Sequence, residues 1–302
     1  MKLKTCLLFA LLSLSGALGL PGLASADDRP VVFASNYPLY FFAREIADGR
    51  VEVLMPDIEG DPAYWAPNGD QAAALQAADL ILLNGAGFEG WLDFVSLREE
   101  RLVDTTAGLK DRLLPLDEAT VHQHGPEGEH SHAGTAFTTW LDPQLAAAQA
   151  EVVAAALSKL VPEGRQRFAQ GLATLQARLQ QLDEGLRQAF ADLGDQPVVF
   201  SHPVYQYLQA RYRLNGRSVH WEPDQSPGTK AWVAFVNLLM EHPARLLIWE
   251  QEPLAETRGR VQEQGVASVV FEPAGNRPAH GDYFAVMERN RQRFQHLSRM
   301  KP

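Results

Sequence analysis

Short, wholly apolar segments alternate with segments of helical periodicity twice along this chain, on either side of one long predicted helix. Such apolar runs are typical of strands in a parallel sheet that helices cover on both faces, because neither face meets water. The strands are predicted at residues 31–34, 51–54, 80–83, 198–200, 246–249 and 268–271. The sequence therefore predicts an α/β fold of two lobes, each with a mainly parallel sheet covered by helices.

The predicted helices indicate how the two lobes are connected. Apolar spacing of three and four residues places helices at 38–47, 69–78, 88–94, 144–160, 204–212, 232–240, 257–264 and 283–297. Residues 163–193 form a further run of about 30 residues, or about 45 Å of helix, which is more than one small domain needs. We interpret this run as a rigid helix that joins the lobes. Ligands of such folds bind at the carboxyl ends of the strands, so a cleft between the lobes is the expected site.

The first residues have the order of a secretory signal. Lys2 and Lys4 precede an apolar segment at 7–20, and a small-residue cleavage site ends at Ala26. We expect cleavage after Ala26 and export to the periplasm. The single cysteine, Cys6, lies inside this segment, so residues 27–302 can form no disulfide and no thiolate metal site.

The expected organisation is a signal peptide at 1–26, a first lobe at 27–162, a linking helix at 163–194 and a second lobe at 195–302. Within the first lobe, residues 118–139 show neither helix nor strand periodicity and are predicted to form a mobile surface loop. This loop contains four of the nine histidines, namely His122, His124, His130 and His132. The formal net charge of −10 opposes non-specific binding of nucleic acid, which needs a basic surface.

Six short motifs, taken in order, carry a resemblance to a known family. They are Asn36-Tyr37-Pro38-Leu39, Asp61-Pro62-Ala63-Tyr64-Trp65-Ala66-Pro67, Asn84-Gly85-Ala86-Gly87-Phe88-Glu89, Trp140-Leu141-Asp142-Pro143, Phe200-Ser201-His202 and Phe271-Glu272-Pro273. By their order and spacing, the chain resembles the zinc and manganese solute receptors of bacterial ABC importers, and most of all the zinc uptake type. The resemblance extends along nearly all of residues 27–302.

The resemblance implies two lobes joined by a long helix, with a divalent metal ion held between them by three imidazoles and a carboxylate. It also implies a periplasmic protein, which we expect to be a monomer, that hands the ion to the membrane permease of an ABC importer. No bond is made or broken in that process, so we expect no enzyme. The chain has no His-Glu-x-x-His pattern and no visible serine or cysteine nucleophile motif.

Only two of the four ligand positions implied by the resemblance hold a good metal ligand. The two histidine positions of the first lobe are occupied by Ala63, which binds nothing, and by Thr138, a poor zinc ligand. The other two positions hold His202 and Glu272. Zinc prefers about four donors, so His202 and Glu272 alone predict a weak site.

The histidine-rich loop offers the missing donors. We hypothesise that His202 and Glu272 form a fixed half of the site, and that loop histidines complete it. Two alternatives remain: the loop only collects zinc at low affinity, or the cleft takes another cargo. A periplasmic zinc buffer or chaperone is a further possible role. Because imidazole favours zinc and carboxylate-rich sites favour manganese, zinc is expected ahead of manganese and other divalent transition metals.

Weaker candidates follow the predicted strands of the second lobe. Glu250 and Glu252 come directly after the strand at 246–249 and are expected to orient an imidazole from outside the coordination sphere. His220 lies in a loop expected between the lobes, where it is a candidate ligand. His242 and His296 are interpreted as histidines on helix surfaces.

The Asp-Pro motif of the first lobe supplies other candidates. Asp61 could offer an oxygen ligand in place of the absent histidine, or only cap the turn. Tyr64 and Trp65, together with Thr138, are expected to line the cleft.

Overall fold

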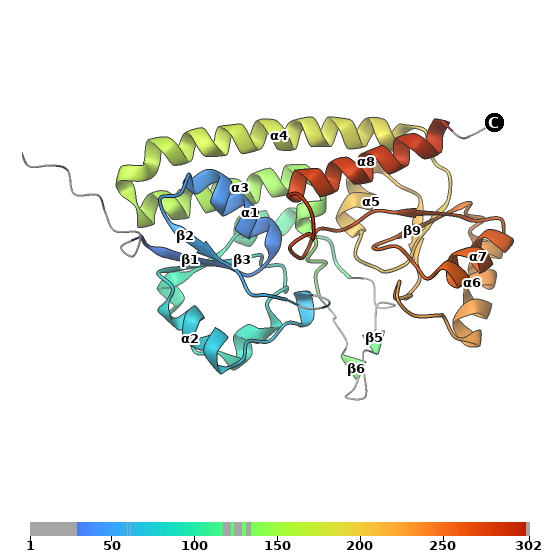
Figure 1. Cartoon of the computed structure of the whole chain (residues 1–302), viewed down its shortest axis with the longest axis horizontal. Helices are drawn as coiled ribbons and strands as arrows, with labels where there is room; N and C mark the ends of the chain where they lie inside the picture. The colour runs from blue at the N-terminus through green and yellow to red at the C-terminus, as the bar shows by residue number, and fades with distance from the viewer. Residues whose placement is uncertain are drawn as a thin grey trace, which may run out of the picture.

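Figure 1 shows the computed structural model, in which two α/β lobes lie side by side beneath long helices. The structure describes residues 29–58, 60, 62–116, 122–123, 129–130 and 134–299. The four-stranded sheet of the first lobe has the order β2-β1-β3-β4, and that of the second lobe has the order β10-β9-β7-β8. Every neighbouring pair in both sheets is parallel, which confirms the predicted fold class.

The strands match the predicted apolar runs closely. In chain order they are β1 (Val31–Ala34), β2 (Glu52–Leu54), β3 (Leu80–Leu83), β4 (Leu102–Asp104), β7 (Val198–Phe200), β8 (Gly216–Ser218), β9 (Leu246–Trp249) and β10 (Ala267–Val270). Strands β4 and β8 were not predicted from the sequence. Both are three-residue strands at a sheet edge, and β8 contains no apolar side chain, so neither has the pattern of a buried strand.

The helices form layers on both faces of each sheet. They are α1 (Tyr37–Ala47), α2 (Gly69–Ala77), α3 (Pro143–Leu160), α4 (Arg165–Ala191), α5 (Gln206–Tyr212), α6 (Thr229–Glu241), α7 (Ala255–Glu263) and α8 (Tyr283–Arg299). Shorter 3₁₀ turns occupy Pro62–Tyr64, Gly90–Phe94, Glu99–Arg101, Ala107–Arg112, Thr139–Leu141 and Pro162–Gly164. The helix predicted at 88–94 is therefore a 3₁₀ turn over Gly90–Phe94.

The predicted long helix is α4, which runs along both lobes at the top of Figure 1, with α3 beside it on the first lobe and α8 on the second. It packs against α1 and α3 as well as against α8. One continuous apolar core includes Val32 and Leu82 of the first sheet, Leu175 and Leu186 of α4, and Ile248 of the second sheet. The two lobes therefore share a core along α4.

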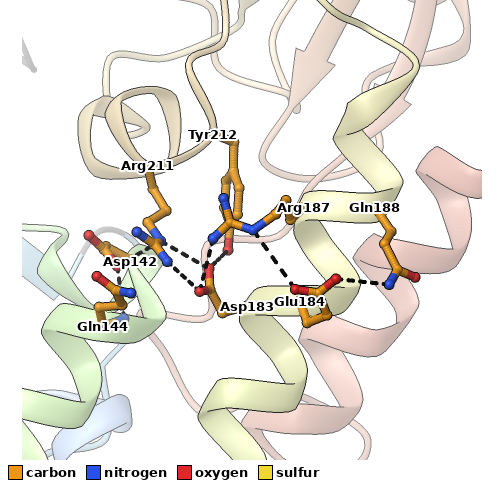
Figure 2. A network of polar contacts seen from close by, with 8 residues as sticks. All are labelled: Asp142, Gln144, Asp183, Glu184, Arg187, Gln188, Arg211 and Tyr212. Carbon is orange, nitrogen blue, oxygen red and sulfur yellow. Dashed lines mark hydrogen bonds and ion pairs between the residues drawn. The ribbon is translucent and has the colours of Figure 1, made fainter.

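A partly buried polar network also ties α4 to both lobes (Figure 2). Arg211 of α5 forms an ion pair with the carboxylate of Asp183 on α4, and its Nε donates to the other carboxylate oxygen at 2.9 Å. The same guanidinium lies 3.6 Å from Asp142, the residue that caps the N-terminus of α3. The hydroxyl of Tyr212 donates to Asp183 at 3.1 Å. The Asp183 carboxylate thus connects α4 to α5 of the second lobe, and Arg211 of α5 also contacts Asp142 at the start of α3.

The close contact between α4 and α1 predicts a measurable effect at one glycine. A Cβ atom on Gly171 would lie 2.8 Å from the Cα and carbonyl oxygen of Ile46 and 2.9 Å from the carbonyl oxygen of Glu45. Because these are backbone atoms, they cannot rotate away. We expect Gly171→Ala to lower the free energy of unfolding by about 1–3 kcal/mol in urea denaturation, although alanine is the better helix former.

Gly185, on the same helix, is the matched control for that substitution. Its added Cβ would meet Arg291 Cδ at 2.9 Å, and a flexible side chain can move. Gly185→Ala is therefore expected to be neutral or to stabilise the protein by up to about 1 kcal/mol. Equal effects of the two substitutions would contradict the close helix contact.

The segment predicted to be a loop is described only in part. Two short antiparallel strands, β5 (His122–Gln123) and β6 (Glu129–His130), place His122 and His130 opposite each other in the backbone register. The prediction of no strand in this segment is therefore wrong at these four residues, which are too few to produce a sequence period. The remaining residues between 117 and 133 lie outside the described part. No helix within the described residues has the length and apolar content needed to cross a bilayer.

Candidate functional site

The two lobes meet where the carboxyl ends of their sheets face each other. After β10, the carbonyl oxygen of Pro273 accepts a hydrogen bond from Trp140 Nε1 at 2.7 Å, and that of Gly275 accepts one from the backbone N–H of Tyr37 at 3.2 Å. The hydroxyl of Tyr283 donates to the carbonyl oxygen of Trp140 at 2.8 Å. The residues that follow β10 are therefore held against the segment that follows β1 and the start of α3.

Thr138 lies inside this junction between the lobes. Its side chain is only 4% exposed, and its hydroxyl donates to the carbonyl oxygen of Val204 at 2.6 Å. Two residues earlier, the carbonyl oxygen of Ala136 accepts a hydrogen bond from the Tyr207 hydroxyl at 2.8 Å. The position at which the resemblance implies a ligand thus adjoins the second lobe, and its hydroxyl is already hydrogen-bonded to the backbone of Val204.

His202 lies at the carboxyl end of β7, two residues before Val204, which accepts the hydrogen bond from Thr138. It is 6% exposed, and its Nδ1 lies 3.3 Å from Glu250 Oε1, at the carboxyl end of the neighbouring strand β9. A carboxylate beside one ring nitrogen holds the proton there, which leaves the lone pair on Nε2, the nitrogen that can coordinate a metal ion. The Glu250 carboxylate thus lies next to the ring that it is predicted to orient, and its role there stays a prediction.

His220 extends the same cluster. It follows β8, the strand on the other side of β7, and its ring centroid lies 6.0 Å from that of His202. The His220 side chain is exposed, whereas His202 is buried. Three adjacent strands thus bring His202, His220 and Glu250 to one edge of the second sheet. This is the largest part of the candidate set that the structure brings together.

Glu272 has different neighbours. Its carboxylate lies 2.9 Å from Arg293 and 4.0 Å from Arg289, both on α8. Asn290 holds its backbone, donating to the carbonyl oxygen at 2.8 Å and accepting from the N–H at 2.9 Å. Two guanidinium groups next to this carboxylate oppose the approach of a cation. Sequence reasoning could not find these contacts, because the arginines come from the last helix.

The remaining candidates have other contacts or face solvent. Glu252 forms an ion pair with Arg258 and is well exposed. Tyr64 is 46% exposed, and Trp65 packs edge-to-face on Trp91, with ring centroids 5.5 Å apart. Trp65 therefore packs within the first lobe.

Several candidate residues lie outside the described part of the chain or are described only as backbone. Asp61, His124 and His132 lie outside the described residues, and His122 and His130 are described only as strand residues. Within the described residues, no three His, Cys, Asp or Glu side chains are grouped so that they could hold a metal ion. His242, expected on a helix surface, is buried instead, and its Nε2 lies 3.0 Å from the carbonyl oxygen of Val198.

Sequence reasoning missed a buried carboxyl in the first lobe. Glu89 accepts hydrogen bonds from the backbone N–H groups of Asn84 at 2.6 Å and Gly85 at 3.0 Å. The side-chain amide of Asn84 in turn donates to the carbonyl oxygen of Phe137 at 2.9 Å. Glu89 thus supports the segment that carries Thr138 into the junction. The sequence feature that could have revealed this turn is its glycines at 84–89. The turn needs glycine at Gly85, because φ there is +76° and a Cβ would collide with Asp104.

The Glu89 carboxyl predicts a specific pH dependence of stability. Burial raises its pKa from the ordinary 4.5 to about 7, against the opposing hydrogen bonds from Ser35 and the backbone. The folded protein then binds this proton more tightly than the unfolded chain. The protonated Glu89 carboxyl therefore contributes its full stabilisation below pH 4.5, and this contribution is lost as the pH rises to 7. In urea unfolding, wild type is expected to lose about 3 kcal/mol over this range relative to Glu89→Gln. Glu100→Gln, at an exposed position, is the control; a Glu89→Gln difference that stays constant with pH would contradict the assignment.

Comparisons with known proteins agree with this architecture. A family model described as "Zinc-uptake complex component A periplasmic" matches residues 32–296. The high-affinity zinc uptake system protein ZnuA of Bacillus subtilis (strain 168) is 27% identical over 236 residues, which are 75% of this chain and 72% of that protein. The description of the family model names a component of an uptake complex and names no reaction.

Solved structures show the same fold. Zn(II)-bound AdcA of Streptococcus pneumoniae superposes with a TM-score of 0.74 at 19% identity, covering 90% of this chain and 58% of AdcA. The ZnuA-like domain of AdcA alone gives a TM-score of 0.73 at 19% identity, covering 90% of this chain and 98% of that domain. The chain therefore corresponds to one domain of that longer protein. With a family model matched from the first strand into the last helix, the chain belongs to the ZnuA family, the periplasmic A component of zinc-uptake complexes.

Proposed function

We propose that this protein binds zinc as its cargo in the periplasm and delivers it, as a monomer, to the membrane permease of an ABC importer. Support comes from family membership, from relatives named for zinc uptake, and from one observation of the site. That observation is the buried His202, whose Nδ1 faces Glu250 at the edge where the second lobe meets the first. Zinc-binding histidines commonly have such a carboxylate on the other ring nitrogen.

The fixed half of the proposed site is centred on His202. Its Nε2 provides the first ligand, Glu250 orients the ring, and the exposed His220 provides a second imidazole after a side-chain rotation. Glu272 stays a proposed carboxylate ligand, on the condition that it exchanges Arg293 for the metal ion. Neutral imidazole and carboxylate are both good zinc ligands, with donor distances near 2.0–2.2 Å.

The loop histidines supply the rest of the coordination in this proposal. Ala63 and Thr138 provide no nitrogen donor, whereas His122, His124, His130 and His132 precede Thr138 in the same connection. A loop anchored at Thr138 starts next to the second lobe, since the Thr138 hydroxyl contacts Val204. The alternative is that these histidines only collect zinc at low affinity.

Calorimetry distinguishes these readings. Titration of the metal-free protein with zinc is expected to show one tight site, and replacing all four loop histidines with alanine is expected to abolish it. If the variant keeps the tight site and loses only weak sites, the loop is a collector and the second lobe binds zinc without it. If wild type shows no tight site at all, zinc is not the cargo.

Delivery of zinc to a permease needs a separate test. The absence of a histidine at Ala63 and Thr138 also favours one other role. A receptor that has lost two ligand positions would also suit a periplasmic zinc buffer that passes metal to another protein. Stimulation of ATP hydrolysis by the purified importer is expected with the zinc-loaded protein and not with the metal-free one. Equal rates with both forms would support the buffer.

A further inference from the structure

A basic cavity lies beside the outer edge of the second sheet, away from His202. Its volume is about 500 Å³, and it lies between β10 on one side and α8 and the start of α7 on the other. Its lining includes Ser268 and Val270 of the strand and three arginines, Arg258, Arg289 and Arg293. Of the groups in the proposed zinc site, Glu272 alone is tied to this cavity, through its contacts with Arg293 and Arg289.

The strand that lines the cavity has an unused edge. β10 is the last strand of its sheet and pairs only with β9. The backbone N–H of Ala267 donates to Arg245 at 2.9 Å, and that of Phe271 donates to Trp249 at 2.8 Å, both toward β9. Because successive residues of a strand point their backbone groups to opposite sides, Ser268 and Val270 direct theirs to the cavity.

Farther along, the same edge already has a partner. Asn290 of α8 donates to the carbonyl oxygen of Glu272 and accepts from its N–H, as a neighbouring strand would. Within the described residues, no such partner faces Ser268 or Val270. The unused edge thus coincides with the cavity and ends where Asn290 begins to cover it.

The charge of the cavity contrasts with that of the whole protein. The chain has a formal net charge of −10, yet three guanidinium groups line this one space. Arg258 is paired with Glu252, and Arg293 lies 2.9 Å from Glu272. Arg289 has only longer contacts, 4.0 Å to Glu272 and 3.4 Å to the carbonyl oxygen of His280, so it is the guanidinium most available to another anion.

We propose that an extended acidic segment of a partner protein adds to the second sheet as a fifth strand along β10. Its backbone would pair with Ser268 and Val270, and its carboxylates would contact Arg289 and the neighbouring arginines. An open strand edge supplies affinity for an extended segment through main-chain hydrogen bonds, and the flanking charges supply selectivity. Charged residues at an edge can also serve only to prevent pairing, and the test separates these two roles.

The probe is a capped synthetic peptide of about six residues, the ordinary length of a strand, that alternates glutamate and valine. We expect saturable binding at low salt, with amide hydrogen exchange slowed at Ser268 and Val270. The same peptide with alternate backbone nitrogens methylated keeps its charges but loses its donors, and it is expected to bind at least about tenfold more weakly. A lysine–valine peptide is expected not to bind.

The matched protein variants are Arg289→Gln and Arg165→Gln. Loss of Arg289 is expected to weaken binding of the acidic peptide by about tenfold, the cost of one charge-assisted hydrogen bond, whereas Arg165, an exposed arginine at the start of α4, should have no effect. Equal binding of the methylated peptide would show attraction by charge alone and overturn strand addition. No binding of the acidic peptide would show that the arginines only shield the edge. Neither result depends on zinc.

Discussion

Replacing His202 with alanine is expected to weaken zinc binding by at least about a hundredfold. Loss of a partner that merely orients a zinc-bound histidine already costs about 10–100-fold, and loss of the ligand itself costs more. The buried position of His202 adds to the effect, since no other histidine of the described residues lies next to Glu250 at that depth. Competition with a chelator of known affinity measures the change.

Two further variants calibrate that result. Glu250→Gln keeps the ring of His202 but weakens its carboxylate partner, so a loss of about 10–100-fold is expected. His296→Ala removes an exposed histidine of α8 and should leave the affinity unchanged. If His296→Ala and His202→Ala weaken binding equally, zinc is bound non-specifically by surface imidazoles.

Replacing Asp183 with alanine is expected to lower the free energy of unfolding by about 3 kcal/mol. The side chains of Asp183 and Arg211 are only 13% and 17% exposed. Removal of one partner leaves a buried guanidinium without its main counter-charge, and such changes cost about 3–5 kcal/mol. We take the lower value because Asp142 stays 3.6 Å from Arg211.

The pKa of Asp183 is consistent with a strong interaction. Burial acts to raise it, yet the hydrogen bond and charge of Arg211, with help from Tyr212 and Arg187, lower it below the ordinary value. The control is Glu184→Ala, the next residue on α4, whose carboxylate is 62% exposed and 3.9 Å from Arg187. A surface pair of that kind contributes about 0–1 kcal/mol. Equal losses in urea unfolding would contradict the importance of the Asp183–Arg211 ion pair shown in Figure 2.

Much of the fold followed from local sequence patterns. Strands such as β3 and β9 are wholly apolar and buried on both faces, so their predicted and observed bounds agree. The long helix α4 was recognisable because its periodicity continues unbroken beyond the size of one lobe. The edge strand β8 was not, because Arg217 and Ser218 are exposed and none of its three residues carries a hydrophobic side chain. Its position is set by pairing with β7, which local patterns do not encode.

The site was predictable only in part, for a related reason. His202 and Glu250 directly follow strands, so the rule for parallel sheets places both at the same edge. The partners of Glu272 come from Arg289 and Arg293 on α8, and only tertiary packing brings them there. The burial of Glu89 likewise depends on how the turn at 84–89 folds back on β3. Pairs close in sequence to strand ends could be inferred, whereas contacts made by distant helices could not.

The proposed function depends most directly on zinc being bound at His202. Anomalous X-ray scattering at the zinc absorption edge, from crystals of the zinc-loaded protein, locates the ion directly. We expect a peak about 2.0–2.1 Å from His202 Nε2, with Nδ1 still facing Glu250. A peak surrounded only by loop histidines and remote from His202 would contradict it.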